Sequence, residues 1–378
     1  MRKVLDRFLF QNKFVSLRNR TELLIHSPSF STRLHFYHIT RSRHKKSILS
    51  LIPEVKGQAP SSMVKYYLKN NGRLEELETP QPGSWVNITP PFDQEELASI
   101  AKQFEVPLDF FTDSLDVDER SRYEREDDVR VILVNTPLLN EINSENEAIY
   151  ITVPIGIILT IDHMITISPY ENPILMGFIE GRVKNFNPSN EKLFVLQLLE
   201  QNVFRFLNCL KKLNLKRNLI EKELYDSSQN KQLRQLLSIE KSLVFFVNSL
   251  SSNELLKMKM KRSDFLGIRS DEDLTDLFED IIIDNSQALE MSNVYTNILN
   301  GTMEAYASII SNNLNQVIQR LTLVTIILML PTLIASLYGM NVKHLPFDES
   351  PYAFFFILAI SIFVSLMMAW WFRRKRLF

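Results

Sequence analysis

Glycine is scarce in this sequence, and its scarcity limits the chemistry that the chain can perform. There are nine glycines in 378 residues, and the closest two are Gly177 and Gly181. A GxGxxG dinucleotide loop and a Walker A loop both need glycines at fixed spacings, because the backbone must approach phosphate groups closely. Neither loop can be found in the sequence, which predicts that no nucleotide is bound and argues against an ATP-driven pump.

Cysteine is almost absent as well. Cys209 is the single cysteine, so the sequence offers no intrachain disulfide framework and no Cys-rich metal site. This composition suits a reducing cytosol for the bulk of the chain. Cys209 lies in an apolar helical stretch with Phe206, Leu207 and Leu210, which predicts a buried, inert thiol.

An arrangement typical of an enzyme active site is also missing. Asp162 and His163 are adjacent, but no nucleophile or metal partner for His163 is visible in the sequence. We therefore expect His163 to be a solvent-exposed histidine in a turn, and we expect the protein not to be an enzyme.

Charge divides the chain into three parts. Residues 1–62 hold 12 Lys/Arg against 3 Asp/Glu, residues 63–320 hold 26 against 39, and the last 58 residues are mostly apolar. The basic segment 1–62 resembles a mitochondrial transit peptide in composition. The alternative is a start codon assigned too early, with Met63 as the true beginning. If residues 1–62 are translated, we expect them to be disordered or weakly helical.

Two apolar runs near the C-terminus are long enough to cross a membrane. Residues 321–338 and 351–372 contain no charged residue. Eighteen helical residues extend about 27 Å, close to the thickness of a bilayer's hydrocarbon core. The basic segment 373–378 follows the second run directly, and such clusters stay cytoplasmic. We therefore predict that both termini are cytoplasmic and that the loop 339–350 is external.

The first apolar run continues a polar stripe that begins before it. Its members recur at steps of three and four residues, so that they share one helical face: Asn315, Ile318, Thr322, Thr325, Met329, Thr332 and Ser336. The stripe favours either packing against another helix or a water-lined path. Because two helices cannot enclose a pore, a channel would require a symmetric ring of subunits.

The remainder of the chain is expected to be a cytosolic head. Short strand and helix patterns alternate in residues 63–190, which predicts an α/β or α+β domain. Strands are predicted at 64–68, 85–88, 129–134, 148–153, 156–161 and 164–168, and helices at 94–104, 107–113 and 172–180. Residues 191–320 instead carry long helical patterns, at 191–225, at 232–261 and from an N-cap near Ser270 onward. Without proline before Pro331, the last helix should form a stalk of some 65 residues, about 100 Å long, that enters the membrane.

The beginning of that stalk is strongly acidic. Residues 263–311 hold ten Asp/Glu and one basic residue, Arg269. Most of these acids are expected to be solvated. However, Asp273, Asp276, Asp280 and Asp284 share one helical face, which would meet a neighbouring subunit in a ring. Oxygen-rich acidic interfaces bind hard divalent cations, so a regulatory cation site is a hypothesis for this face.

The end of the first apolar run adds a short motif. The segment 321–341 is LTLVTIILMLPTLIASLYGMN, and the basic cluster closes the following run. In this context the chain resembles the CorA family of divalent-cation channels over roughly residues 63–378. The likeness is most specific in the terminal segment and weaker around Asp113–Glu126. Pro331 departs from the commonest family pattern by one position.

The resemblance implies a pentameric funnel with Mg²⁺ both transported and regulatory. It implies that Gly339, Met340 and Asn341 form the external selectivity ring. Its pore-lining positions correspond to Asn315, Ile318, Leu321, Thr325, Met329 and Thr332. Its regulatory acids correspond to Asp113 and Asp280, to which the acidic face adds Asp284, and its lower stalk acid to Glu304.

The predicted function is passive entry of Mg²⁺ down the membrane potential, with Co²⁺ and Ni²⁺ as further substrates. Asp348 and Glu349 either raise the cation concentration at the mouth or are merely solvated. The expected location is the bacterial inner membrane, or the mitochondrial inner membrane if residues 1–62 are a transit peptide. The alternatives are a zinc transporter of the same family and a membrane-anchored scaffold. No nucleic acid is expected to bind.

Overall fold

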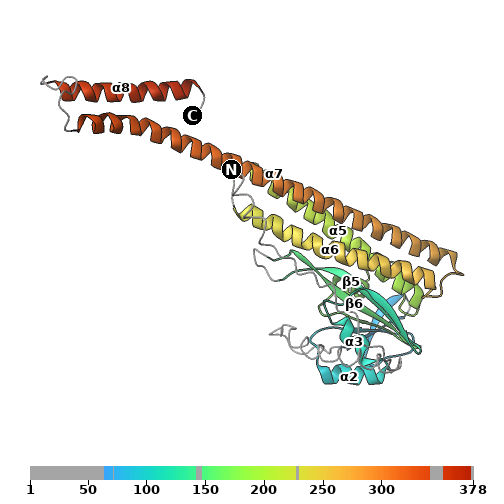
Figure 1. Ribbon diagram of the computed structural model, residues 1–378. Helices are drawn as coiled ribbons and strands as arrows, with labels where there is room; N and C mark the ends of the chain where they lie inside the picture. Colours follow the sequence, from blue (N-terminus) through green and yellow to red (C-terminus); the bar gives the residue numbers. More distant parts are fainter. Residues whose placement is uncertain (1–63, 71, 142–146, 227–229, 341–351, 376–378) are drawn as a thin grey trace, which may run out of the picture. The chain divides into compact units, whose positions relative to one another are not determined.

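Figure 1 shows the computed structural model, which describes residues 64–70, 72–141, 147–226, 230–340 and 352–375. The predictions for residues 1–62, Asn341, Asp348 and Glu349 lie outside the described residues.

Seven strands form one mixed sheet in the order β2-β1-β3-β7-β6-β5-β4. Neighbouring strands are antiparallel except for β3 and β7, which are parallel. The strands are β1 (Val64–Asn70), β2 (Arg73–Leu77), β3 (Trp85–Ile88), β4 (Arg122–Glu126), β5 (Val129–Leu139), β6 (Tyr150–Leu159) and β7 (Met164–Ile167).

Helices cover both faces of this sheet because its strands alternate apolar side chains between the faces. Val86 joins one core, which contains α2 (Gln94–Gln103) and α3 (Leu108–Ser114). Trp85 joins the other core, which contains α4 (Pro173–Ile179) and the long helices. The predicted α/β fold class is thereby confirmed.

Three helices are much longer than the rest: α5 (Glu191–Asp226), α6 (Asn230–Ser263) and α7 (Glu272–Tyr338). Helix α7 has 67 residues and passes Pro331 without a break, so it extends about 100 Å as predicted. The N-cap prediction was wrong by one residue. Asp271 is the cap, because its carboxylate accepts a hydrogen bond from the Leu274 amide at 3.1 Å.

The strand predictions need a correction around Pro154. Residues 148–153 and 156–161 were predicted as two strands, but β6 is one strand that runs through Pro154. Pro154 lies opposite Asn135 and has no N–H to give. Asn253 of α6 accepts from the Asn135 amide at 3.1 Å and donates to the Asn135 carbonyl at 2.8 Å. This exchange ties α6 to the sheet.

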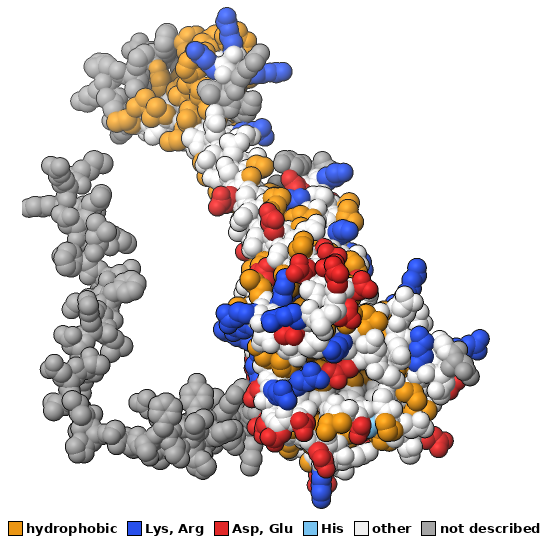
Figure 2. Space-filling view, turned by 90° about the vertical axis from the view of Figure 1, so that its right-hand side faces the viewer, with side chains coloured by type: hydrophobic (Ala, Val, Ile, Leu, Met, Phe, Trp, Pro, Cys, Tyr) orange, Lys and Arg blue, Asp and Glu red, His pale blue; other side chains and the backbone are white. Residues whose placement is uncertain are grey.

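The last described helix, α8 (Ala353–Arg374), packs along the end of α7 (Figure 1). The two helices are long and apolar enough to cross a membrane, with mean hydropathies of 2.1 and 2.2 in their most apolar windows, of which 6% is buried. Figure 2 shows hydrophobic side chains gathered on this end of the molecule, with Lys and Arg at its rim. Such extensive apolar exposure fits two membrane spans.

Candidate functional site

The polar stripe of α7 lies on the side of the helix that α8 leaves uncovered. The less exposed side chains of this part of α7 include Leu323, Ile327, Leu330 and Ile334, which form the face toward α8. At 100° per residue, the centre of the stripe is about 150° around the helix from that face. Every predicted pore-lining side chain is exposed in the single chain: Asn315, Ile318, Leu321, Thr322, Thr325, Met329, Thr332 and Ser336.

The threonine hydroxyls of this stripe are already hydrogen-bonded within α7. Thr322 donates to the Ile318 carbonyl at 2.9 Å, and Thr325 donates to the Leu321 carbonyl at 2.8 Å. Two turns later, Thr332 donates to the Leu328 carbonyl at 3.0 Å. Their oxygens still have lone pairs free to accept from water, so these threonines can border a hydrated path without unsatisfied donors.

The stripe leads to the end of α7. Gly339 caps the helix, and its amide donates to the Ala335 carbonyl at 2.9 Å. The side chain of Met340 is 53% exposed. The chain therefore leaves the helix at Gly339, the first residue of the segment Gly339-Met340-Asn341, which is called here the GMN segment.

The acidic face at the start of α7 is solvent-facing in the single chain. Asp273, Asp276 and Asp280 are exposed, and Asp284 is half-buried. Glu304, further along α7, is also exposed. Among the described residues, no three His, Cys, Asp or Glu side chains are close enough to hold a metal ion together.

Asp113, the other predicted regulatory acid, is buried and bound to an arginine. Its carboxylate accepts from Arg122 Nη2 at 2.6 Å, and only 5% of the residue is exposed. Arg122 also contacts Glu119 and Glu124. Burial alone would lower the pKa of Arg122, but Glu119, Asp113 and Glu124 together raise it. Any cation that binds at Asp113 has to compete with this guanidinium.

Asp113 is held in place by the close approach of α3 to the sheet. A Cβ at Gly156 of β6 would lie 2.0 Å from the Ser114 hydroxyl, so only glycine fits there. This contact puts α3 on the sheet face opposite the one that packs against the start of α7. We therefore infer that Asp113 and Asp280 of one chain are on different sides of its sheet.

A polar layer between α7 and its neighbours was not predicted. Lys257 of α6 is fully buried, and its Nζ lies 2.7 Å from Oδ1 of Asn285 on α7. Burial lowers the pKa of Lys257 to about 7. Asp284, the preceding residue, faces Glu200 of α5, and burial followed by this like charge raises the pKa of Glu200. One feature of the sequence could have predicted this layer: Lys257 follows Leu250 by seven residues and therefore lies on the apolar face of α6.

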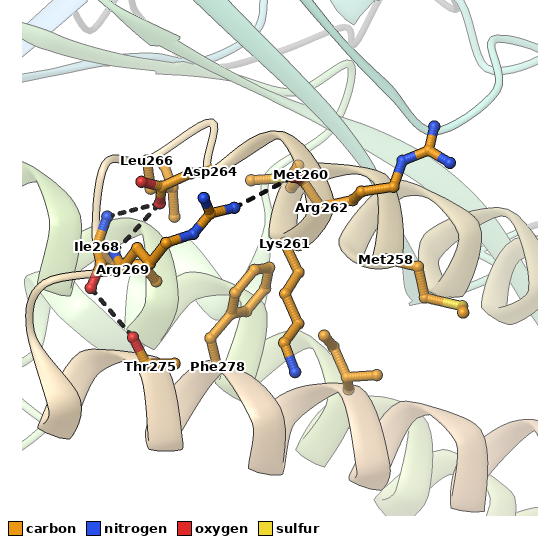
Figure 3. A pocket seen from close by; sticks show the side chains of 11 residues that line it. Met258, Met260, Lys261, Arg262, Asp264, Leu266, Ile268, Arg269, Thr275 and Phe278 are labelled. Carbon is orange, nitrogen blue, oxygen red and sulfur yellow. Dashed lines mark hydrogen bonds between the residues drawn. The ribbon is translucent and has the colours of Figure 1, made fainter.

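A cavity of about 660 Å³ lies at the turn between α6 and α7 (Figure 3). Its polar groups serve the turn itself. Asp264 accepts from the amides of Ile268 and Arg269 at 2.9 and 3.2 Å, and Thr275 donates to the Ile268 carbonyl at 3.1 Å. The arrangement holds the beginning of α7 beside α6. The carboxylate that lines the cavity, Asp264, is used by these backbone amides, so the cavity is not a good cation site.

Two predictions on single residues had different outcomes. Cys209 is a buried free thiol, as predicted, and burial raises its pKa. His163 lies in the turn between β6 and β7 but is only partly exposed, which corrects the prediction of a solvent-exposed side chain. Its ring packs edge-on against Phe104, and its Nδ1 is 3.2 Å from the buried Ser84 hydroxyl.

Several known proteins are similar to this chain in sequence and in fold. A family model described as CorA-like Mg²⁺ transporter protein matches residues 81–374. The cobalt/magnesium transport protein CorA of Methanocaldococcus jannaschii is 27% identical over 295 residues, which are 77% of this chain and 90% of that protein. The magnesium transport protein CorA of Campylobacter jejuni is 23% identical over 317 residues, covering 81% and 94%.

Among solved structures, the complete CorA magnesium transporter from Methanocaldococcus jannaschii gives a TM-score of 0.69 at 23% identity, covering 84% of this chain and 99% of that one. This likeness establishes the fold. Together with the family match over most of the chain and the two apolar helices, it leads to one conclusion: the chain belongs to the CorA-like Mg²⁺ transporter family.

Proposed function

We propose that this protein is a passive channel for Mg²⁺, formed by five identical subunits around a central path lined by α7. The observation that carries the proposal is the polar stripe, which faces away from α8 and leads to the GMN segment. A stripe on the uncovered face is available to border an axis in a ring. Co²⁺ and Ni²⁺ would follow the same path.

Selection is proposed to occur at Gly339, Met340 and Asn341. Mg²⁺ loses its water reluctantly, so a ring of amide and carbonyl oxygens does better to accept hydrogen bonds from the hydrated ion. Carboxylates at this point would hold the ion too strongly, because conduction requires weak binding. Asp348 and Glu349 would raise the local concentration of cations at the mouth.

The driving force is proposed to be the membrane potential. Entry of a divalent cation into an inside-negative compartment gains about 4.6 kcal/mol per 100 mV, so no nucleotide is required. The basic residues Arg373, Arg374 and Lys375 favour a cytoplasmic position for this end of α8. We assign the protein to a bacterial plasma membrane, with the sheet and the long helices in the cytoplasm.

Reconstitution of the purified protein into proteoliposomes tests this proposal. With a Mg²⁺-sensitive dye inside and an inside-negative potential, we expect Mg²⁺ influx that grows with the potential and is inhibited by external Co²⁺. Empty liposomes are the control. Influx at the level of empty liposomes would contradict the proposal, and selective Zn²⁺ flux would favour the zinc alternative. Native mass spectrometry should give five subunits, whereas a monomer would favour a scaffold.

Regulation is proposed to use intracellular Mg²⁺ between subunits. Asp280 is exposed, whereas Asp113 lies on the other side of its own sheet, so these two carboxylates can meet only between neighbouring chains. Mg²⁺ bound there, beside Asp284, would hold the subunits in a closed ring. Glu304 lies 24 residues, or about 36 Å, further along α7 than Asp280, so it would belong to a separate, lower site. Loss of the ion would leave the carboxylates to repel one another and loosen the ring.

Asp280→Asn is therefore expected to raise the Mg²⁺ concentration needed for closure by about tenfold, the typical size of such a coupling. The measurement is Mg²⁺ influx at a series of internal Mg²⁺ concentrations. Glu290→Gln is the matched control, since Glu290 is an acid of α7 outside the acidic face. Unchanged block in Asp280→Asn, or an equal shift in Glu290→Gln, would count against this regulation and would leave the conduction proposal intact.

A further inference from the structure

A cluster of cations lies at one end of the pair formed by α7 and α8. Arg373, Arg374 and Lys375 end α8, and Arg320 precedes the apolar part of α7. From the loop that joins the helices, 18 residues lead back to Arg320 and 22 lead to Arg374, about 27 and 33 Å. Because α8 packs along α7, the four cations lie at a similar depth. They are called here the basic cluster.

The described residues provide no acidic partner for the basic cluster. In this part of the chain, no ion pair joins any of its members to Asp or Glu. Going back along α7, the first acid before Arg320 is Glu304, sixteen residues or about 24 Å away. That separation exceeds the Debye length of about 8 Å at physiological salt. Neutralisation of the cluster therefore requires an anion from outside the described chain.

The last turns of α8 combine this charge with an apolar track. Phe363, Met367, Trp370 and Arg374 follow one another at steps of four, three and four, so that they share one face. The three apolar members are 66%, 53% and 59% exposed. The Arg374 guanidinium stacks on the Trp370 ring, with 5.4 Å between Cζ and the ring centroid. Stacking orients the guanidinium and leaves its N–H groups free for phosphate oxygens.

We propose that this face binds an anionic phospholipid, with the headgroup phosphate at Arg374 and an acyl chain along Trp370, Met367 and Phe363. A free phosphate would use only the cations. A lipid also covers the exposed apolar track, which continues without interruption from the charge toward the middle of the span. Tryptophan is favoured at the membrane–water boundary, which places Arg374 at the depth of the headgroups.

The test uses the full-length protein in detergent with phosphatidylglycerol or phosphatidylcholine of the same chain length. Native mass spectrometry should retain phosphatidylglycerol preferentially, and phosphatidylglycerol should raise the thermal midpoint more than phosphatidylcholine. Arg374→Gln should weaken phosphatidylglycerol binding, by about fivefold for the one charge removed. It keeps Arg373 and Lys375, so the orientation should persist. Arg269→Gln/Lys259→Gln, which removes two exposed cations of the cytosolic part, should bind like the wild type.

Three results would overturn the proposal. They are equal retention of the two lipids, an equal loss in the control variant, and equal stabilisation by inorganic phosphate alone. The last result would show a phosphate site without a lipid. If Arg374→Gln does not fold, the variant Trp370→Leu gives the test instead, because it keeps every charge and an apolar side chain but removes the stacked ring. We expect it to weaken phosphatidylglycerol binding and to leave the weak binding of phosphatidylcholine unchanged.

Discussion

Asn341→Ala is expected to reduce Mg²⁺ uptake to the level of protein-free liposomes while the ring of subunits still assembles. The substitution removes the amide oxygens that would accept hydrogen bonds from the hydrated ion at the mouth of the path. The stripe on α7 would remain, but an ion could not be concentrated and aligned at its outer end. Uptake is measured with a Mg²⁺-sensitive dye, and assembly by native mass spectrometry.

Asn313→Ala is the matched control for this prediction. Asn313 is an exposed asparagine of the same helix, about 140° around it from the centre of the stripe. Its replacement should leave uptake unchanged. Wild-type uptake by Asn341→Ala would contradict the role of the GMN segment, and a loss in both variants would point to damage of α7 as a whole.

Long periodic elements were predictable from the sequence because one helix face or one apolar run is a local signal. The unbroken α7 and the two spans belong to this class. Strands β2 and β4 were missed because they lie at the two edges of the sheet and carry many charges. Charged edge strands are common because they discourage pairing with other chains, and they hide the alternation that identifies a strand.

The contacts of the site depend on distances that sequence spacing does not reveal. Asp113 and Arg122 meet because α3 and β4 are adjacent in space, so a residue expected to hold a cation already has one. Asp113 was found through the resemblance, but its partner could not be. The polar stripe is different, since helical periodicity alone places its members on one face. The packing of α8 then decides that this face stays uncovered.

Replacing the pair Lys257 and Asn285 by Met and Leu is expected to stabilise the protein, most strongly below pH 7. Lys257 is fully buried between α6 and α7, and Asn285 is its hydrogen-bond partner. The charged groups near it are Glu254 on α6, which Ser286 of α7 contacts, and more distantly Asp284 with Glu200. Burial dominates over the attraction of Glu254, so the folded state disfavours the charged amine.

The pH dependence follows from the direction of this shift. The pKa of Lys257 falls from 10.5 to about 7 on folding, so between these values the unfolded chain binds a proton that the folded chain does not. The wild-type free energy of unfolding should therefore rise with pH above 7, by at most about 1.4 kcal/mol per pH unit. Below pH 7 the amine is charged in both states, and the full cost of its burial is present.

The double variant removes both the charge and the Asn285 Oδ1 that would otherwise lose its donor, so a stabilisation of about 1–4 kcal/mol is expected below pH 7. Lys257→Met alone should gain less, because Asn285 Oδ1 is then left without a donor. Thermal unfolding of the full-length protein in detergent between pH 6 and 9 measures the effect. Lys259→Met, at an exposed position of the same helix, should keep the wild-type slope. A double variant with the same slope as the wild type would show that Lys257 is not the titrating group, and the rise would then belong to another group of the bundle.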